Sequence, residues 1–311
     1  MQLALTLDTR DERALIYCQQ LGVHYVFGQP DRWDLASLQA MRHRVAMAGL
    51  ELLGIDTLPS GMFDQVLLGA AEAGDQLERL RQLIHDLGAA GLGLIGYRWA
   101  LPAVERTSQA PVGRGGTLVQ GFDPGLLERE RPTSPTTTAE GLWDSLARFL
   151  DALLPIAERA GVRLAGQLDC PPCTSVGGVP RILVDPAAIR RFLDLAPSPS
   201  HGIDLHTEAV ALMPDVDLDA MIRQLVRRHK LLMLRLGNVQ PHGDGFRECF
   251  LDEGIISMPG LLRTLREGGY TGPLRTAPPP TLVDDTDWGH QGRAHDIGYV
   301  KALWQVVEQL G

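Results

Sequence analysis

The chain has 311 residues, 44% of them hydrophobic, and a net charge of −9. This length supplies one large hydrophobic core, and an acidic balance with dispersed arginines argues against a nucleic-acid partner. The first apolar run, residues 3–7, is too short for a signal peptide or a membrane span, so we expect a cytoplasmic protein with no membrane attachment.

Short apolar runs alternate with amphipathic helical patterns along the whole chain. The predicted strands cover residues 3–7, 24–27, 51–56, 93–97, 163–169, 202–206, 231–236 and 273–276. The predicted helices cover residues 11–21, 35–48, 75–89, 139–160, 186–195, 218–228, 259–267 and 293–310. Eight such alternating units predict an α/β fold, a (β/α)8 TIM barrel that forms a single domain over residues 1–311. An open doubly wound sheet is the alternative.

Residues typical of helix ends support several of these boundaries. Thr137 with Glu140 predicts a capping box before the longest helix. Asp185, followed by a proline, predicts an N-cap with proline in the first helical position. Gly161 and Gly88 stand where we expect helices to end and the chain to turn into the next strand.

One segment interrupts the alternation. Residues 103–135 are rich in Gly, Pro, Thr and Arg and lack a helical period. A loop of this length inside a compact domain is typically a lid, a binding loop or disordered. Because it follows the predicted strand at 93–97, we expect it to fold over the mouth of the barrel as a lid.

Polar residues stand where the predicted strands end. The loops after the strands of a β/α barrel converge on one face, and active sites are built there. The strand at 163–169, for example, runs into a loop with two consecutive prolines. We expect the following residues on this functional face: Tyr97, Arg98, Gln167, Asp169, His206, Arg235 and Asn238.

Cys170 and Cys173 form a CxxC unit directly after that strand. With His206 and Asp169 they could form a zinc site, or they could act as a redox pair. A second spaced pair, which a zinc site of this kind needs, is absent from the sequence, and two prolines between the cysteines do not suggest the helix of a redox motif. Free thiols are therefore the default, with His206, Cys170 and Cys173 as weak metal-ligand candidates.

The second half of the chain resembles the mannonate dehydratases, metal-dependent lyases of sugar-acid catabolism with a xylose-isomerase-like barrel. The similarity lies in LPIAERAGVRLA leading to DCPP, then in GVPRI, SPSHGI, GNV, GGYTGPLR and IGYVKAL. The first half matches more loosely, through AGLELLGID, LGAAGLGLIGYRW and RGGTLVQGFD. The resemblance covers nearly the whole chain, and it implies a sugar-acid substrate and association into a homodimer or larger homo-oligomer.

The resemblance also implies where a metal site would lie. The metal ligands of the family, a histidine, a cysteine, a second histidine and an aspartate, fall on Gln167, His206, Arg235 and Ala277. The catalytic histidine falls on Pro278, so His206 alone of these positions keeps a metal-binding side chain. A divalent cation needs several converging donors, and a neighbouring arginine repels it. We therefore expect no cofactor, with the manganese or similar metal of the family largely lost.

Arg235 at a former metal position has two interpretations. It could bind a carboxylate or phosphate in bidentate fashion, with Arg98 adding to the same anion site. It could instead pair with a neighbouring acid such as Asp169 or Asp204 and only hold the barrel mouth together. His206 could likewise be a general base, a metal ligand or a histidine with a purely structural hydrogen bond.

Two functions from different classes remain open. In the first, Arg235 as electrophile, His206 as acid–base and Asp169 catalyse a lyase or isomerase reaction on a sugar acid or another small hydroxy acid. Its substrate-binding residues would be Tyr97, Arg98, Gln167 and Asn238. In the second, the chain is a catalytically silent relative that binds a small anion or a protein partner. A genuine metal-dependent dehydratase with a rebuilt site is a further alternative.

Overall fold

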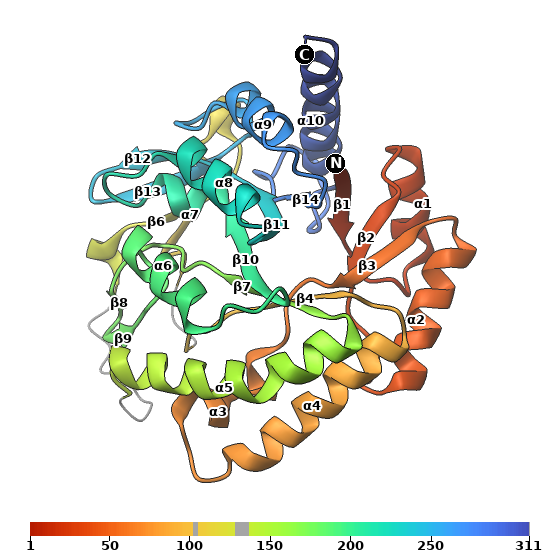
Figure 1. The fold of residues 1–311 in the computed structure, drawn as a ribbon. Coiled ribbons are helices and arrows are strands. Elements are labelled where there is room, and N and C mark those ends of the chain that lie inside the picture. The colour runs from red at the N-terminus through yellow and green to blue at the C-terminus, as the bar shows by residue number, and fades with distance from the viewer. Residues whose placement is uncertain (102–104, 128–136, 311) are drawn as a thin grey trace.

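The computed structural model describes residues 1–101, 105–127 and 137–310. Eight parallel strands close into a barrel in the order β1-β14-β11-β10-β7-β4-β3-β2 (Figure 1). Their bounds are β1 (Gln2–Thr6), β2 (Tyr25–Gly28), β3 (Glu51–Ile55), β4 (Leu94–Tyr97), β7 (Arg163–Gln167), β10 (His201–His206), β11 (Leu231–Leu236) and β14 (Pro273–Thr276). The predicted TIM barrel is confirmed, and the open sheet is excluded because β1 pairs with both β2 and β14.

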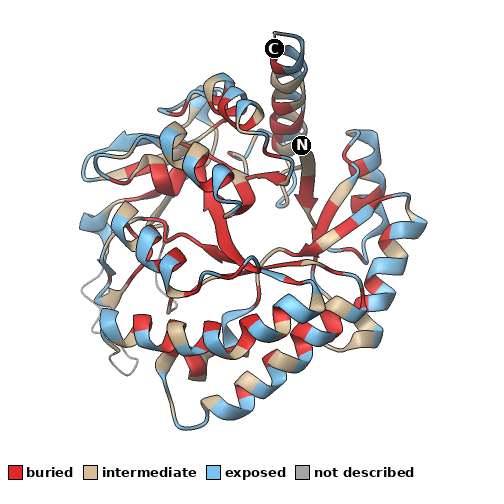
Figure 2. Cartoon of the chain, viewed as in Figure 1, coloured by how far each residue is buried: buried red, intermediate tan, exposed pale blue. Residues whose placement is uncertain are grey.

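Helices surround the barrel and turn their apolar faces toward it. The long helices are α1 (Glu12–Gln20), α2 (Leu35–Met47), α4 (Ala73–Ala89), α5 (Ala139–Ala160), α6 (Pro186–Leu195), α8 (Leu218–Arg227), α9 (Met258–Glu267) and α10 (His290–Leu310). Short helices lie at α3 (Asp64–Leu68), α7 (Thr207–Ala211), η1 (Ser60–Met62), η2 (Arg114–Gly116) and η3 (Pro124–Leu126). Figure 2 shows the buried side of the helices facing the strands and the exposed side facing outward. The eight predicted helices are present within a few residues of their expected bounds.

Two of the predicted caps are confirmed. The Asp185 carboxylate accepts a hydrogen bond from the backbone N–H of Ala188 at 2.7 Å, so it caps the N-terminus of α6. Gly161 ends α5 in the left-handed region, with φ 69°, where a glycine avoids the steric cost of a side chain.

The other two cap predictions are wrong by one to three residues. The N-cap of α5 is Thr138 rather than Thr137, because the Thr138 hydroxyl accepts from the backbone N–H of Gly141 at 3.0 Å. Gly88 lies inside α4, and the chain turns after the helix at Gly91, with φ 72°. Thr137 and Thr138 are equally suitable N-caps, and Gly88 and Gly91 are equally suitable helix ends, so the sequence pattern alone does not decide between them.

The segment predicted as a lid contributes strands to a small sheet beside the mouth. Of residues 103–135, positions 103–104 and 128–135 lie outside the described residues. The described part carries β5 (Ser108–Ala110) and β6 (Val119–Phe122), which join β12 (Asn238–His242) and β13 (Gly245–Cys249) in the antiparallel order β12-β13-β6-β5. A separate ribbon pairs β8 (Ser175–Val176) with β9 (Val179–Pro180). A lid role for this segment stays a prediction.

The barrel interior changes character along its axis. A small apolar cluster, including Phe27, Leu94 and Met233, fills the barrel interior beneath the polar side chains at the C-terminal ends of the strands. The guanidinium of Arg275 lies 5.2 Å from the centroid of the Phe27 ring and marks where charged residues begin. Within the described residues, no helix combines the length and apolar character needed to cross a membrane.

Candidate functional site

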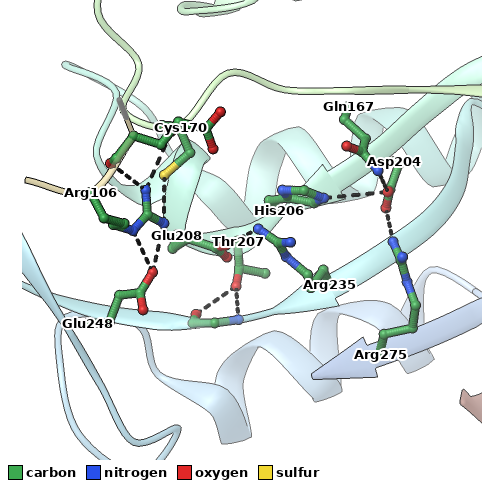
Figure 3. A network of polar contacts seen from close by, with 12 residues as sticks. Arg106, Gln167, Cys170, Asp204, His206, Thr207, Glu208, Arg235, Glu248 and Arg275 are labelled. Carbon is green, nitrogen blue, oxygen red and sulfur yellow. Dashed lines mark hydrogen bonds and ion pairs between the residues drawn. The ribbon is translucent and has the colours of Figure 1, made fainter. Parts of the chain in front are cut away.

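Charged side chains converge at the C-terminal ends of four neighbouring strands (Figure 3). The register of the barrel places Asp204 of β10 beside Gln167 of β7, and His206 of β10 beside Arg235 of β11. Arg235 in turn lies in register with Arg275 of β14. Because neighbours in register point to the same side of a sheet, the structure brings these groups together at the mouth.

Arg235 pairs with Glu208, the second residue of the short helix α7. The Nη2 group of Arg235 donates to Oε1 of Glu208 at 2.7 Å. The expected partners, Asp169 and Asp204, are therefore not the ones that it hydrogen-bonds. Burial favours the neutral form of Glu208, but the charge of Arg235 and its hydrogen bond more than offset this effect and lower the pKa of Glu208 below the usual value. Among the residues that the structure describes, neither Nε of Arg235 nor Oε2 of Glu208 has a hydrogen-bond partner.

Arg98, directly after β4, provides a second cation at the mouth. It forms an ion pair with Glu105, and its Nη2 lies 3.7 Å from Oδ1 of Asp169. This Nη2 has no hydrogen-bond partner within the described part of the chain. Burial, together with repulsion from Arg181 and Arg235, lowers the pKa of Arg98 to about 10, which leaves it charged at neutral pH.

Asp169 is fully engaged in holding the loop after β7. Its Oδ1 accepts from Nη1 of Arg181 at 3.1 Å, and its Oδ2 accepts from the backbone N–H of Leu183 at 3.0 Å. The residue is only 2% exposed. Asp169 therefore positions Arg181 and the loop, and it lies at the edge of the site through its contact with Arg98.

Asp204 is the hub of a second group of polar contacts. Its carboxylate accepts from Nη2 of Arg275 at 2.5 Å and from Nε2 of Gln167 at 3.2 Å, and it lies 3.4 Å from Nε2 of His206. Arg275 also forms an ion pair with Asp56. Burial and the nearby charge of Arg235 lower the pKa of His206 well below its ordinary value, so the imidazole is neutral at neutral pH.

The sequence analysis did not select Arg275, Asp56 or Glu208 as site residues. Arg275 could have been recognised from the sequence, because it is a charged residue inside a predicted strand whose other inward-facing residues are apolar or small. Glu208 follows His206 by two residues, but α7 is too short to be recognised from a helical pattern. Asp56 directly follows β3, and only its ion pair with Arg275 shows that it belongs to the site.

Two expected substrate-binding residues lie away from this polar group. The Tyr97 ring packs against Phe149 of α5 and Trp99, with centroid distances of 5.2 and 6.4 Å, in the layer between strand and helix. Asn238 is 2% exposed; its amide donates to the backbone carbonyl of Ile256 at 3.0 Å and accepts from the N–H of the same residue. In this structure Tyr97 packs the core and Asn238 fastens the loop after β13.

The cysteines are free thiols, and Cys170 is buried beside Arg106. Its Sγ lies 3.7 Å from Nη2 of Arg106, which also pairs with Glu248 at 2.7 Å. Burial outweighs the attraction of Arg106 and raises the pKa of Cys170 to about 11. Such a thiol is a weak nucleophile and a reluctant metal ligand at neutral pH, because both roles need the thiolate.

The donors at the mouth do not fit a divalent cation. Gln167 directs its amide N–H groups to Thr57, at 2.6 Å, and to Asp204. Arg235 places a positive charge where a ligand would be needed, and Ala277 and Pro278 bring no side-chain donor. Over residues 1–101, 105–127 and 137–310, no three His, Cys, Asp or Glu side chains gather so as to hold a metal.

Comparison with known proteins places the chain in one family. The family model of D-mannonate dehydratase (UxuA) matches residues 134–310. The mannonate dehydratase of Enterococcus faecalis is 25% identical over 89% of this chain and 87% of its own length, and that of Shouchella clausii is 30% identical over 58% and 52%. The crystal structure of mannonate dehydratase from Streptococcus suis serotype 2 superposes with a TM-score of 0.90 at 23% identity, covering 100% of this chain and 95% of that one. An L-ribulose 3-epimerase gives a TM-score of 0.65 at 16% identity over 99% and 96%. The resemblance noted in the sequence is confirmed: this chain belongs to the D-mannonate dehydratase (UxuA) family.

Proposed function

We propose that this chain is a diverged member of its family that binds a sugar acid or another small hydroxy acid at the barrel mouth, with the metal site of the family largely lost. The ligand carboxylate is held by Arg98 and Arg235. The observation that carries this proposal is the pair of unpaired N–H groups, Nη2 of Arg98 and Nε of Arg235, which find no acceptor within the described residues. Buried donors without an acceptor are costly, and a bound anion would satisfy them.

Exposure separates these two arginines from the other cations of the mouth. The side chains of Arg98 and Arg235 are 26% and 28% exposed, whereas those of Arg181 and Arg275 are 1% and 4% exposed and serve internal carboxylates. A guanidinium binds a carboxylate through two parallel N–H groups, and such charge-assisted bonds are about twice as strong as neutral ones. Arg98 and Arg235 are thus more accessible to a ligand from solution than Arg181 and Arg275 are.

His206 supports a catalytic version of this function, a carbon–oxygen lyase or isomerase acting on the bound hydroxy acid. Its neutral imidazole is the state that a general base needs. It would accept the proton from the carbon beside the ligand carboxylate, while Arg235 would stabilise the charge that develops on that carboxylate. In the lyase reaction the imidazolium would return this proton to the hydroxyl that leaves the next carbon, so that water departs as the double bond forms; in an isomerisation it would return the proton to carbon. Asp169 would act by positioning Arg98, and Gln167 would face the ligand through its remaining acceptor oxygen. A silent anion-binding relative would share the same arginines without turnover.

The proposal is tested by titrating EDTA-treated protein with mannonate and gluconate in a calorimeter. We expect Arg235→Gln to weaken binding by at least about tenfold, since it removes a charge-assisted contact. Arg13→Gln, on the exposed face of α1, is the control and should bind like the unaltered protein. Equal affinity in Arg235→Gln and the control would refute the proposal. Proton NMR of the same samples then separates turnover from silent binding.

The remaining parts of the proposal follow the family. We place the protein in the cytoplasm, without a nucleic-acid or membrane partner, and as a homodimer or larger homo-oligomer formed through the helices outside the barrel. A mass measured by light scattering at the chain mass of 33.9 kDa would contradict the oligomer.

A further inference from the structure

The second carboxylate oxygen of Glu208 is buried, charged and unpaired. Glu208 is 3% exposed, and its Oε1 already accepts from Arg235. The lowered pKa of this residue keeps it ionised at neutral pH. Its Oε2 has no donor within the described residues. An ionised oxygen left without a donor is expensive to bury, so a partner from outside the chain is to be expected.

The backbone around Glu208 fixes the position of this buried oxygen beside Gly237. Thr207 donates to the backbone carbonyl of Gly237 at 2.7 Å and accepts from its N–H at 2.9 Å, which fixes the start of α7 against the end of β11 (Figure 3). A Cβ atom at Gly237 would lie 2.6 Å from Oε2 of Glu208. A side chain at position 237 would therefore press against the carboxylate, and glycine lets Glu208 pack here.

Glu208 lines a small cavity at the ends of β11 and β14 together with Gly237, Ala277 and Pro278. Neither Ala277 nor Pro278 carries a side-chain donor that could reach the carboxylate. Glu248 also lines this cavity, but its own carboxylate is paired with Arg106. A ligand hydroxyl or a water molecule can supply the donor that Oε2 lacks.

We propose that Glu208 is a specificity-determining residue that accepts a hydrogen bond from the hydroxyl on the carbon next to the ligand carboxylate. This inference rests on the proposed function, in which Arg235 binds that carboxylate. The Arg235 guanidinium would then link the two contacts, since its Nη2 donates to Glu208 and its Nε would donate to the ligand carboxylate. A 2-hydroxy acid carries its hydroxyl and its carboxylate on adjacent carbons and can therefore contact both residues at once. A ligand without the hydroxyl would leave Oε2 buried and unpaired.

The test compares two ligands that differ in this hydroxyl alone, mannonate and 2-deoxygluconate. We expect the unaltered protein to prefer mannonate by at least about tenfold, the effect of leaving a buried charged acceptor unpaired. Glu208→Gln keeps an oxygen for Arg235 but replaces the second acceptor with an N–H donor, so the preference should fall to within about threefold. Glu248→Gln removes the same charge from the same cavity and should keep the full preference.

The outcomes separate this inference from the function on which it rests. If the unaltered protein binds mannonate and Glu208→Gln retains the full preference, Glu208 is not the determinant, a water satisfies its oxygen, and the proposed function stands. If Glu248→Gln loses the preference equally, the effect is one of charge and the assignment to Glu208 is overturned. If neither ligand binds the unaltered protein, the proposed function fails and takes this inference with it. A ratio of affinities is insensitive to a simple loss of folded protein.

Discussion

Strand β10 carries a buried histidine at each of its ends, and the two histidines have different surroundings. His201, at the N-terminal end, packs its ring 4.4 Å from that of Phe192, and its Nδ1 lies 3.2 Å from the carbonyl of Ala196. His206, at the C-terminal end, lies next to Asp204 and within the field of Arg235. One end of the strand is held by packing and backbone contacts, the other by charges.

This difference teaches which end of the barrel serves stability and which serves function. Buried ion pairs lose much of their attraction to desolvation and are often less stabilising than apolar residues of similar volume. A mouth that keeps Arg235, Glu208, Asp204 and Arg275 close together with several unpaired atoms is thus poorly explained by stability. In β/α barrels the C-terminal face is where binding residues collect, and the apolar opposite end supports the fold.

The largest effect is expected from removing the central cation of the mouth. Arg275→Met leaves the fully buried carboxyl group of Asp204 and the partly exposed one of Asp56 without their shared partner. Breaking a buried pair in this way costs about 3–5 kcal/mol of the free energy of unfolding, measured by urea denaturation. Arg10→Met, which breaks an exposed pair with Asp8, should cost far less, because solvent screens such a pair.

Equal losses in the two variants would mean that the mouth is solvated like the surface. If Arg275→Met fails to fold, Arg275→Lys provides the measurement. It keeps the charge but cannot form the fork that reaches both carboxylates, so an intermediate loss is expected.

A smaller effect is expected at the other end of the strand and depends on pH. Burial lowers the pKa of His201 to about 4, whereas the unfolded value is near 6.5. Between these two pKa values the histidine binds a proton in the unfolded chain but not in the folded protein. The free energy of unfolding therefore falls as the pH falls from 6.5 toward 4. The contribution of this group at pH 5 is a loss of about 2 kcal/mol relative to neutral pH.

His201→Phe keeps an aromatic ring against Phe192 and removes the titration. The loss of unfolding free energy between pH 7.5 and pH 5 should therefore be about 2 kcal/mol smaller in this variant than in the unaltered protein. Identical pH profiles would show that His201 titrates normally, and the packed end of the barrel would then be more open to water than the structure indicates.

The sequence predicted the barrel and most of the mouth, because both follow from regular patterns. Alternation of strands and helices set the fold, and the ends of the strands identified Arg98, Gln167, His206 and Arg235. Tyr97 was placed on the wrong side although the pattern contained the answer, since successive residues of a strand point to opposite faces and Arg98 takes the inward one.

Other features depended on contacts between distant parts of the chain. Asn238 is a polar residue at a strand end, but its hydrogen-bond partners include backbone groups of Ile256. The sequence pattern does not show that these two residues are in contact. The choice of Glu208 over Asp169 and Asp204 as the partner of Arg235 depends on the helical start of α7, which is five residues long. Pairing among several acids and arginines is decided by geometry and not by residue type.

The smallest expected effect separates a mouth held by arginines from one held by a metal. A cation that binds only the folded state stabilises it, more so the further its free concentration exceeds its Kd, so its removal lowers the melting temperature. In this chain Glu208 is already paired with Arg235, and Asp204, whose pKa burial raises to about 7, is paired with Arg275. We therefore expect the same melting temperature with EDTA as with added manganese, measured by differential scanning calorimetry. A rise with manganese that disappears in His206→Gln would mean that donors around His206 bind the ion despite the adjacent guanidinium. The comparison between the two ends of β10 would then become one between a packed end and a metal-binding end.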